Sequence, residues 1–359
     1  MFFLVLTSRV VYALMWFYVA PMLPLMLKDF RVSPGNAGLL PAVFIAGAAL
    51  TQIPAGYMGA RVGHNKAAGL GMAVFGSSAV LTGLADSWEK TLIFRALGGI
   101  GAGLFFSTAG AVLVILRPRD PATALGWYNA TFNLGAFLGY YWGYIAGAVG
   151  WRPATALPGI FAVALGLALT QGPSVRSPTA FSWRAFRLGL ASFPFWGSVY
   201  AANSLTATWA HLYRGVGEEV AGAISSTAML SGLFAGIAGR LYRFKYTVLL
   251  APLAASAVYL AIPHVPTYLI PLPVFIYGLS FSIYITAVYT TASRRAENPA
   301  SALAVINVTN MALGMHLSYF FSWLMEISPT YPWLFLSTLV LTSALTTCRE
   351  NAGGGGFRG

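Results

Sequence analysis

The chain alternates between long apolar runs and short polar breaks, and this pattern predicts its structural elements. A helix that spans a bilayer needs about 20 mostly apolar residues, and the backbone between two spans has to be short or in water. Cutting the sequence at its charges and at its Pro and Gly clusters leaves runs of this length throughout. The pattern predicts twelve membrane-spanning helices, at residues 7–27, 36–58, 67–86, 90–116, 121–148, 152–171, 184–210, 218–241, 246–262, 268–292, 299–325 and 329–347.

The loops between these predicted helices are short, and no domain outside the membrane fits between them. The longest, QGPSVRSPTAFSWR at 171–184, falls between the sixth and seventh helices. We therefore expect an all-α membrane protein of two six-helix bundles. The N-terminal bundle covers 1–172, a short cytoplasmic linker covers 173–186, the C-terminal bundle covers 187–348, and a Gly-rich cytoplasmic tail covers 349–359.

The composition supports lipid as the main solvent. Apolar residues make up 57% of the chain and charged residues 8%, whereas a soluble domain carries about 25% charged residues. The net charge of +12 is spread singly between apolar runs, so we expect no nucleic-acid partner. The single cysteine, Cys348, excludes an intramolecular disulfide and a CxxC metal site. We expect neither a metal nor a cofactor, and the N-terminal run is interpreted as a retained first anchor because it lacks a small-x-small cleavage site.

The distribution of Lys and Arg predicts the orientation, because cytoplasmic loops carry the excess of these residues. If the N-terminus is cytoplasmic, the outer loops hold Lys28, Arg31, Lys90, Arg152 and Arg214, while Arg9 and Arg95 lie inside helices. All the other basic residues then lie in inner loops or the tail, which places both termini in the cytoplasm of a cell whose plasma membrane holds the protein. These inner residues are Arg61, Lys66, Arg117, Arg119, Arg176, Arg184, Arg187, Arg240, Arg243, Lys245, Arg294, Arg295, Arg349 and Arg358.

A repeat relates the two halves of the chain. The segment Pro121-Ala-Thr-Ala-Leu returns as Pro299-Ala-Ser-Ala-Leu, and Asn129-Ala-Thr returns as Asn307-Val-Thr, with the same separation of 178 positions. Both copies lead from an inner loop into a helix, the fifth in one half and the eleventh in the other. Parallel repeats of this kind are one of the standard ways to build a carrier. The repeat therefore predicts two equivalent six-helix halves that rock about a site between them.

Short motifs of glycines and basic residues recur along the chain. The second inner loop reads GYMGARVGHNK (56–66), and the fourth helix reads RALGGIGAG (95–103). A degenerate copy of the first, GIAGRLYRFK, stands at 236–245, and GWR stands at 150–152. These motifs resemble those of the major facilitator superfamily of secondary transporters. The resemblance implies a twelve-helix monomeric transporter, not an enzyme, that moves a small molecule by alternating access. It implies a gating role for Gly56, Arg61, Gly63, Lys66, Gly239 and Arg240.

The chain departs from the superfamily pattern at two positions. The Asp of the signature is Ala60 here. In the fifth helix, Tyr140 stands where proton-coupled drug exporters carry a Pro, which argues against an exporter. The small-residue spacing survives in Gly135, Gly139 and Gly143, and it predicts close helix packing.

Polar residues at membrane depth are expected to face a cavity or a partner. Asn129, Asn133 and Tyr140 share one helical face by their spacing, and the superfamily resemblance places the first, fourth, seventh and tenth helices around the central cavity. Asparagines also act as hydrogen-bonding contacts between helices, so that interpretation stays open. The candidate substrate-binding residues are Arg95, Asn129, Asn133, Tyr140, Tyr200, Asn203, Tyr277, Ser280, Tyr284, Asn307 and Asn310.

Arg95 is the most informative of these candidates. A lone guanidinium inside a span costs about 2.5–3.5 kcal/mol at the helix centre and less near the ends. It either extends outward to Asp86 or Glu89 as a structural charge or binds an anionic substrate, and we favour the second interpretation. The predicted function is transport of a small organic anion or polar metabolite; the alternative is proton-coupled export of amphipathic or drug-like compounds.

No Asp or Glu lies in the middle of any predicted span. Proton-driven carriers commonly use such a carboxylate. His316 is then the possible proton carrier, although its helical face opposes that of Asn307, and a packed, hydrogen-bonded imidazole is the alternative. We therefore expect a facilitator or an exchanger.

Overall fold

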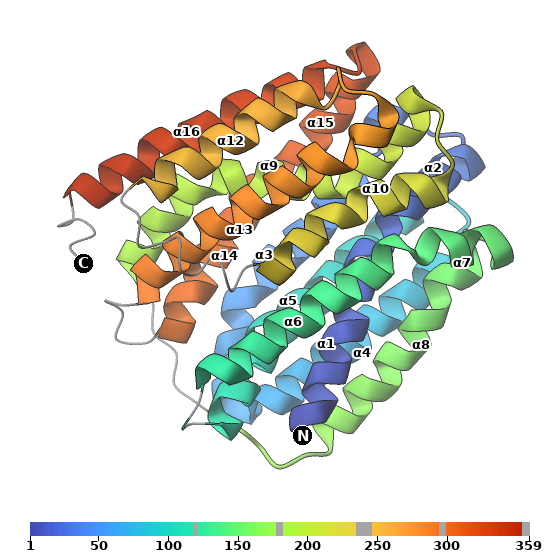
Figure 1. Cartoon of the computed structure of the whole chain (residues 1–359). Coiled ribbons are helices and arrows are strands. Elements are labelled where there is room, and N and C mark those ends of the chain that lie inside the picture. The colour runs from blue at the N-terminus through green and yellow to red at the C-terminus, as the bar shows by residue number, and fades with distance from the viewer. Residues whose placement is uncertain (118, 120, 177–181, 235–245, 294–298, 354–359) are drawn as a thin grey trace. The chain divides into compact units, whose positions relative to one another are not determined.

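A computed structural model gives the fold of the chain, and it describes all residues except 118, 120, 177–181, 235–245, 294–298 and 354–359 (Figure 1). The described residues are almost entirely helical and form two compact units. The first unit comprises Met1–Val32 and Leu39–Ala180, and the second comprises Ser33–Gly38 and Phe181–Gly359.

The helices of the first unit follow the predicted spans within a few residues. They are α1 (Phe2–Phe17), α2 (Val19–Phe30), α3 (Leu39–Val62), α4 (His64–Gly83), α5 (Trp88–Leu116), α6 (Pro121–Tyr140), α7 (Trp142–Val149) and α8 (Trp151–Thr170).

The second unit repeats this series. It contains the short 3-10 turn η1 (Pro34–Asn36), then α9 (Trp183–Arg214), α10 (Glu218–Ser231), η2 (Gly232–Phe234), α12 (Thr247–Ala261), η3 (Thr267–Leu269), α13 (Pro271–Ser293), α14 (Pro299–Gly314), α15 (His316–Ile327) and α16 (Tyr331–Gly353).

Helix pairing is the same in both units. In the first, α1 packs against α6, α3 against α5, and α4 against both α5 and α8. In the second, α9 packs against α14, α10 against α13, and α12 against both α13 and α16. Each pair in one unit has its counterpart in the other when the helices are counted in chain order. The repeat found in the sequence is therefore a repeat of packing within each unit.

Among the described residues, three predicted spans divide into two α-helices each. The first divides at Tyr18 into α1 and α2, the fifth divides at Tyr141 into α6 and α7, and the eleventh divides at Met315 into α14 and α15. Pro21 accounts for the first break, because its ring removes the hydrogen bond that Phe17 would accept and crowds that carbonyl. The other two breaks are 174 positions apart, about one helical turn short of the repeat separation of 178, and Gly314 directly precedes the second of them.

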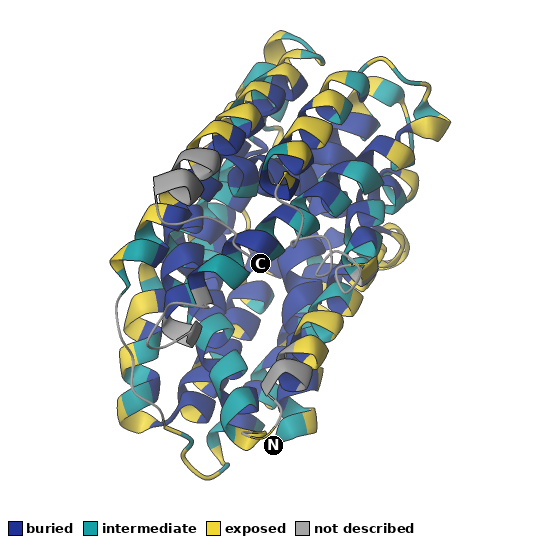
Figure 2. Ribbon diagram, turned by 60° about the vertical axis from the view of Figure 1, so that its left-hand side comes forward, coloured by how far each residue is buried: buried dark blue, intermediate teal, exposed yellow. Residues whose placement is uncertain are grey.

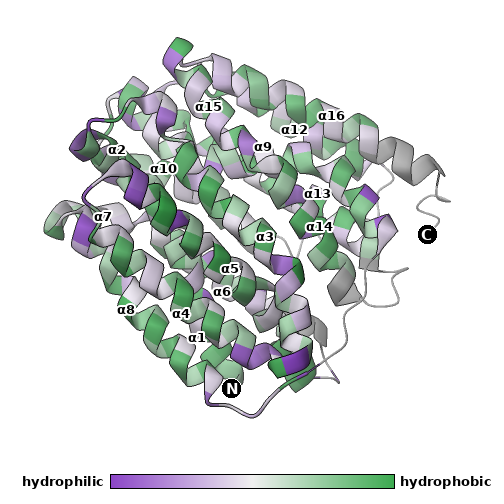
Figure 3. Cartoon of the chain, turned by 180° about the vertical axis from the view of Figure 1, so that it is seen from behind, coloured by the Kyte–Doolittle hydropathy of each residue, from purple (hydrophilic) through white to green (hydrophobic). Residues whose placement is uncertain are grey.

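The surface of the helices suits lipid. Leu50, Leu84, Phe161 and Leu345 each expose 65% or more of their area, and Figures 2 and 3 show exposed and apolar positions along the helices of both units. By length and composition, five described stretches qualify as membrane spans: Phe2–Phe30, Pro34–Val62, Trp88–Leu116, Trp151–Thr170 and Thr267–Ala292. Helices such as α9 fall outside this set because many Ser, Thr and Asn residues lower their hydropathy.

Candidate functional site

Arg95 is buried in the first unit, where α5 faces α1 and α3. Its side chain is 4% exposed, and Nη1 and Nη2 donate long hydrogen bonds of 3.4 Å to the carbonyl oxygens of Met15 and Trp16. The guanidinium carbon lies 4.1 Å from the ring centre of Phe44. The Arg95 side chain thus reaches the α1 backbone, while Lys90 Nζ donates to Asp86 at 2.6 Å. Both interpretations of Arg95, as a structural charge and as a ligand of an anionic substrate, stay predictions.

A second buried arginine lies on α1. Arg9 is 2% exposed, and its guanidinium carbon lies within 5 Å of four aromatic ring centres. Its Nε and Nη1 have no hydrogen-bond partner among the described residues. We call this group of rings the aromatic box. They belong to Tyr12 at 4.8 Å, Phe106 at 4.9 Å, Tyr128 at 3.9 Å and Phe132 at 4.5 Å.

One part of this site is visible in the sequence as a helical spacing on the first helix. Arg9, Tyr12 and Trp16 follow each other at helical spacing on α1. The partner rings come from α5 and α6, however, and only the packing of those helices brings them to Arg9. Phe106 lies on α5, the helix that carries Arg95, and Tyr128 directly precedes the candidate Asn129 on α6.

The three candidates on α6 and its end differ in their surroundings. Asn129 is exposed and Asn133 is half-buried. Tyr140 is fully buried, and its ring centre lies 5.3 Å from that of Phe17. The three residues of the expected common face thus differ in burial, and the Tyr140 ring packs against Phe17 of α1.

The candidates of α9 and α13 meet inside the second unit. The Tyr277 hydroxyl donates to Asn203 Oδ1 at 2.9 Å, and both side chains are buried. Tyr200 is buried and stacks on Trp196 with ring centres 5.4 Å apart. Ser280 and Tyr284 are buried as well.

The two asparagines of α14 are engaged in hydrogen bonds between helices. Asn310 Oδ1 accepts from the Ser192 hydroxyl at 2.9 Å, and Asn307 Oδ1 accepts from the Tyr289 hydroxyl. The amide nitrogen of Asn310 is buried without a hydrogen-bond partner among the described residues. These contacts match the interpretation of asparagines as interhelical hydrogen-bonding groups.

The predicted gating residues of the first unit surround the start of α4. Arg61 and Lys66 are exposed, and Gly56 is half-buried. Gly63 has φ +109°, which explains a glycine at this turn. Gly239 and Arg240 lie outside the described residues.

Asn65, beside the predicted gating residues, was not predicted as a site residue. It is fully buried, and its Nδ2 donates to the carbonyl oxygens of Leu169 and Gly172, both at 3.1 Å. Its Oδ1 accepts from the Val175 amide at 3.0 Å. This one side chain therefore fastens the segment after α8 to the loop that carries the signature.

His316 is exposed at the first residue of α15. Its imidazole is therefore not packed in the core of the second unit, and its role as a proton carrier stays a prediction.

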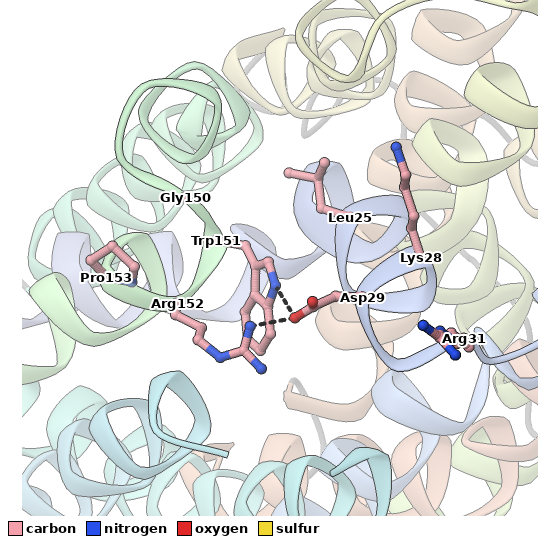
Figure 4. A pocket seen from close by; sticks show the side chains of 8 residues that line it. All are labelled: Leu25, Lys28, Asp29, Arg31, Gly150, Trp151, Arg152 and Pro153. Atoms are coloured by element: carbon pink, nitrogen blue, oxygen red, sulfur yellow. Dashed lines mark hydrogen bonds and ion pairs between the residues drawn. The ribbon is translucent and has the colours of Figure 1, made fainter. Parts of the chain in front are cut away.

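A hollow of about 580 Å³ lies where the end of α2 meets the start of α8. Trp151 and Arg152 both donate to Asp29, as Figure 4 shows. The hydrogen bonds from Arg152 and then Trp151 hold the pKa of Asp29 below its ordinary value. Lys28 and Arg31 point away from this ion pair (Figure 4). The charges around the hollow do not converge on one point, so this hollow is not the candidate site.

The family model of the Major Facilitator Superfamily matches residues 5–319. The chain belongs to this superfamily. Its members are membrane transporters, so the predicted class of a multi-pass, non-enzymatic membrane protein is confirmed.

Two curated relatives illustrate the range of the superfamily. The quinolone resistance protein NorA of Staphylococcus aureus (strain MSSA476) is 24% identical over 216 residues, which cover 52% of this chain and 55% of that protein. The multidrug efflux protein YfmO of Bacillus subtilis (strain 168) is 29% identical over 134 residues, which cover 37% of this chain and 34% of that protein. The chain thus spans about half or less of the length of these relatives.

Solved structures share the fold over nearly the whole chain. A bacterial homolog of the human lysosomal transporter Spinster, in its inward-facing and occupied conformation, matches with a TM-score of 0.73 and 16% identity, covering 98% of this chain and 94% of that one. A D-xylose-proton symporter matches with a TM-score of 0.74 and 14% identity, covering 96% and 95%. The predicted twelve-helix fold is confirmed by these likenesses.

Proposed function

We propose that this protein carries a small organic anion or a closely related polar metabolite across the plasma membrane by alternating access. The observation that carries the proposal is the buried Arg95 guanidinium. Its side chain is 4% exposed, and its hydrogen bonds to the carbonyl oxygens of Met15 and Trp16 are long, at 3.4 Å each. A charge-assisted bond to a carboxylate is shorter and stronger than these contacts. A substrate anion is the group that suits this position.

The energy source in this proposal is a solute gradient or a counter-solute. Proton-coupled carriers commonly titrate a carboxylate within the membrane. Asp120 and Glu326 lie at the ends of predicted spans, and Ala60 stands where the superfamily signature has its Asp. Facilitated transport or exchange therefore fits the chain better than a proton pump.

The remaining parts of the proposal concern organisation. Both termini are cytoplasmic because the positive charge gathers on the inner loops. The protein works as a monomer of two bundles, residues 1–172 and 187–348, and the segment Gly56–Lys66 acts in gating together with Gly239 and Arg240. The substrate-binding residues are those named from the sequence, headed by Arg95.

A second candidate function is proton-coupled export of amphipathic compounds. The names of the relatives, quinolone resistance protein and multidrug efflux protein, favour it. Tyr140, which replaces the exporters' Pro, argues against it.

Counterflow in proteoliposomes tests the first function against the second. Purified protein is reconstituted and loaded with an organic-acid mixture, and uptake of labelled acids and of uncharged analogues is measured without a pH gradient. We expect exchange of at least one acid and none of its uncharged analogue. Exchange of uncharged compounds alone would overturn the organic-anion proposal, and transport only under a pH gradient would favour the exporter.

A further inference from the structure

We infer that Arg9 and its aromatic box form a docking position for the carboxylate of the transported solute, and that the substrate class is an organic carboxylate with a flat aromatic body. This inference rests on the proposed function and names its substrate more narrowly. Arg9 was not among the residues that the sequence suggested, and it lies on α1, whereas Arg95 lies on α5.

The charge of Arg9 lacks a counter-ion among the described residues. Arg9 is 2% exposed, and a buried cation is strongly unfavourable unless it is paired. The described ion pairs of the chain join Lys90 to Asp86, Arg152 to Asp29 and His211 to Glu218, so Arg9 has no ion pair among the described residues. The rings offset part of this cost by cation–π attraction, which is stronger when the cation is desolvated.

The hydrogen bonds of Arg9 are incomplete. Tyr128 forms a side-chain hydrogen bond with Arg9, but the ring faces of the box supply no oxygen acceptor to the remaining N–H groups. Nε and Nη1 of Arg9 are both buried and lack an acceptor among the described residues. Buried donors of this kind are rare in native proteins, and each one needs an explanation. A carboxylate supplies the missing acceptors and the missing negative charge together, and Arg binds carboxylates through two parallel hydrogen bonds.

Contacts with neighbouring residues hold the tyrosines of the aromatic box in place. The Tyr128 hydroxyl donates to the Phe106 carbonyl at 2.9 Å, which ties α6 to α5. The Tyr12 ring stacks on Phe105 with centres 4.8 Å apart. These contacts hold two walls of the box in place around the guanidinium, as a preorganised binding position requires.

The four rings of the aromatic box differ in how far they are buried, which bears on how a ligand reaches Arg9. The walls made by Tyr12 and Tyr128 are buried, whereas Phe106 and Phe132 are half-buried. The exposed side of the box therefore consists of two phenylalanine rings that can rotate without breaking a hydrogen bond. A ligand that enters there meets ring faces around its body and the Arg9 edge at its carboxylate. This arrangement favours a flat aromatic acid over a small aliphatic one.

Equilibrium binding to the purified full chain in nanodiscs tests the inference. The probes are benzoate, 3-phenylpropionate and indole-3-acetate, the carboxamide of each, and acetate and succinate as anions without a ring. Wild type is expected to prefer at least one aromatic carboxylate over its carboxamide by about tenfold or more, in line with a charge-assisted hydrogen bond. It is expected to bind acetate and succinate more weakly than that carboxylate.

Variants separate binding from folding. Arg9→Gln is expected to bring the carboxylate-to-carboxamide ratio close to one while the affinity for the carboxamide stays unchanged, an effect that a merely structural role would not produce. Arg9→Lys is expected to keep a reduced preference. Phe132→Leu removes a wall without changing the charge, and it is expected to weaken aromatic carboxylates several-fold but not acetate. Arg187→Gln, an exposed arginine on α9, is the matched control and is expected to behave as wild type.

The outcomes distinguish this inference from the function on which it rests. An unchanged preference in folded Arg9→Gln would overturn the inference, and so would wild-type protein that binds none of the aromatic carboxylates. If other organic acids still exchange in counterflow, the proposed function stands without it. If no organic acid exchanges either, both fail. Should Arg9→Gln not purify as a folded protein, Arg9→Lys and Phe132→Leu decide, and the aromatic affinity has to fall in Phe132→Leu for the inference to survive.

Discussion

Tyr277 on α13 donates its hydroxyl hydrogen to the amide oxygen of Asn203 on α9, at 2.9 Å and with both side chains buried. These two residues lie 74 positions apart in the chain, and both were proposed from helical faces alone. A variant that removes this hydrogen bond therefore distinguishes a substrate-binding role of the pair from a structural role.

Tyr277→Phe removes the donor and leaves the Asn203 oxygen buried. We expect a loss of about 1–3 kcal/mol in the free energy of unfolding, because a buried acceptor loses its partner. If the pair is structural only, transport by the folded variant stays near wild type, and if the pair binds substrate, the KM for the transported solute rises several-fold. Thermal unfolding in detergent and initial uptake rates are measured on the same preparation.

Arg95→Lys keeps the charge but replaces a planar fork by a point charge, so transport of the anion is expected to weaken several-fold. Arg95→Ala is expected to abolish transport. Uptake at wild-type rate by folded Arg95→Ala protein would remove Arg95 from the site, and size-exclusion chromatography provides the folding control.

The close contact of α6 with α1 is expected to depend on Gly139. A Cβ atom at this position would lie 2.7 Å from the Leu14 carbonyl oxygen and 3.1 Å from the Tyr18 amide nitrogen. Gly139→Ala is therefore expected to destabilise the protein by about 1–3 kcal/mol through overpacking. Gly126→Ala is the control on the same helix, since a Cβ there has no neighbour within 4 Å. It is expected to be neutral or to stabilise the helix by about 0.5–1 kcal/mol, and equal melting temperatures for the two variants would contradict the packing argument.

The Asp29–Arg152 contact predicts a pH dependence. The pKa of Asp29 is lowered, first by the hydrogen bond from Arg152, so this contact stabilises the folded state above the ordinary carboxyl pKa. The contribution is lost as the pH falls through the lowered value. At pH 7 the free energy of unfolding of the wild type is expected to exceed that of Arg152→Gln. The difference is no more than about 1 kcal/mol, because the pair is partly exposed. The difference between the two proteins is expected to shrink as the pH falls below the ordinary carboxyl pKa, and a difference that grows on acidification would show the wrong sign.

Energy coupling is tested through His316. Without a carboxylate at mid-membrane depth, counterflow is expected to proceed equally with and without an imposed pH gradient. His316→Gln is expected to change neither rate. Accumulation that requires the gradient would reject the facilitator proposal, and its loss in His316→Gln would identify this imidazole as the proton carrier.

The twelve helices were predictable because lipid leaves the backbone few alternatives, so long apolar runs have one interpretation. The breaks at Tyr141 and Met315 were not, since the hydropathy of the chain continues through them. Pairings such as Asn307 with Tyr289 could not be predicted either, because they depend on which helices pack together and on where each residue lies along its helix. Arg9 was missed for the same reason: its surroundings come from three helices, and a single sequence shows the charge without the rings.

The turn η1 bears on how the protein is made. The Gly38 amide donates to Ser322 Oγ at 3.0 Å, and the Ser322 hydroxyl donates to the Gly35 carbonyl at 2.6 Å. These bonds join residues 284 and 287 positions apart, whereas the helix pairs of the first unit form within its own segment of the chain. Because the ribosome delivers the N-terminal segment first, the first bundle can assemble while the second is still being synthesised. The loop at 33–38 then has to wait until α15 has been inserted, which makes its attachment to Ser322 one of the last events of biogenesis.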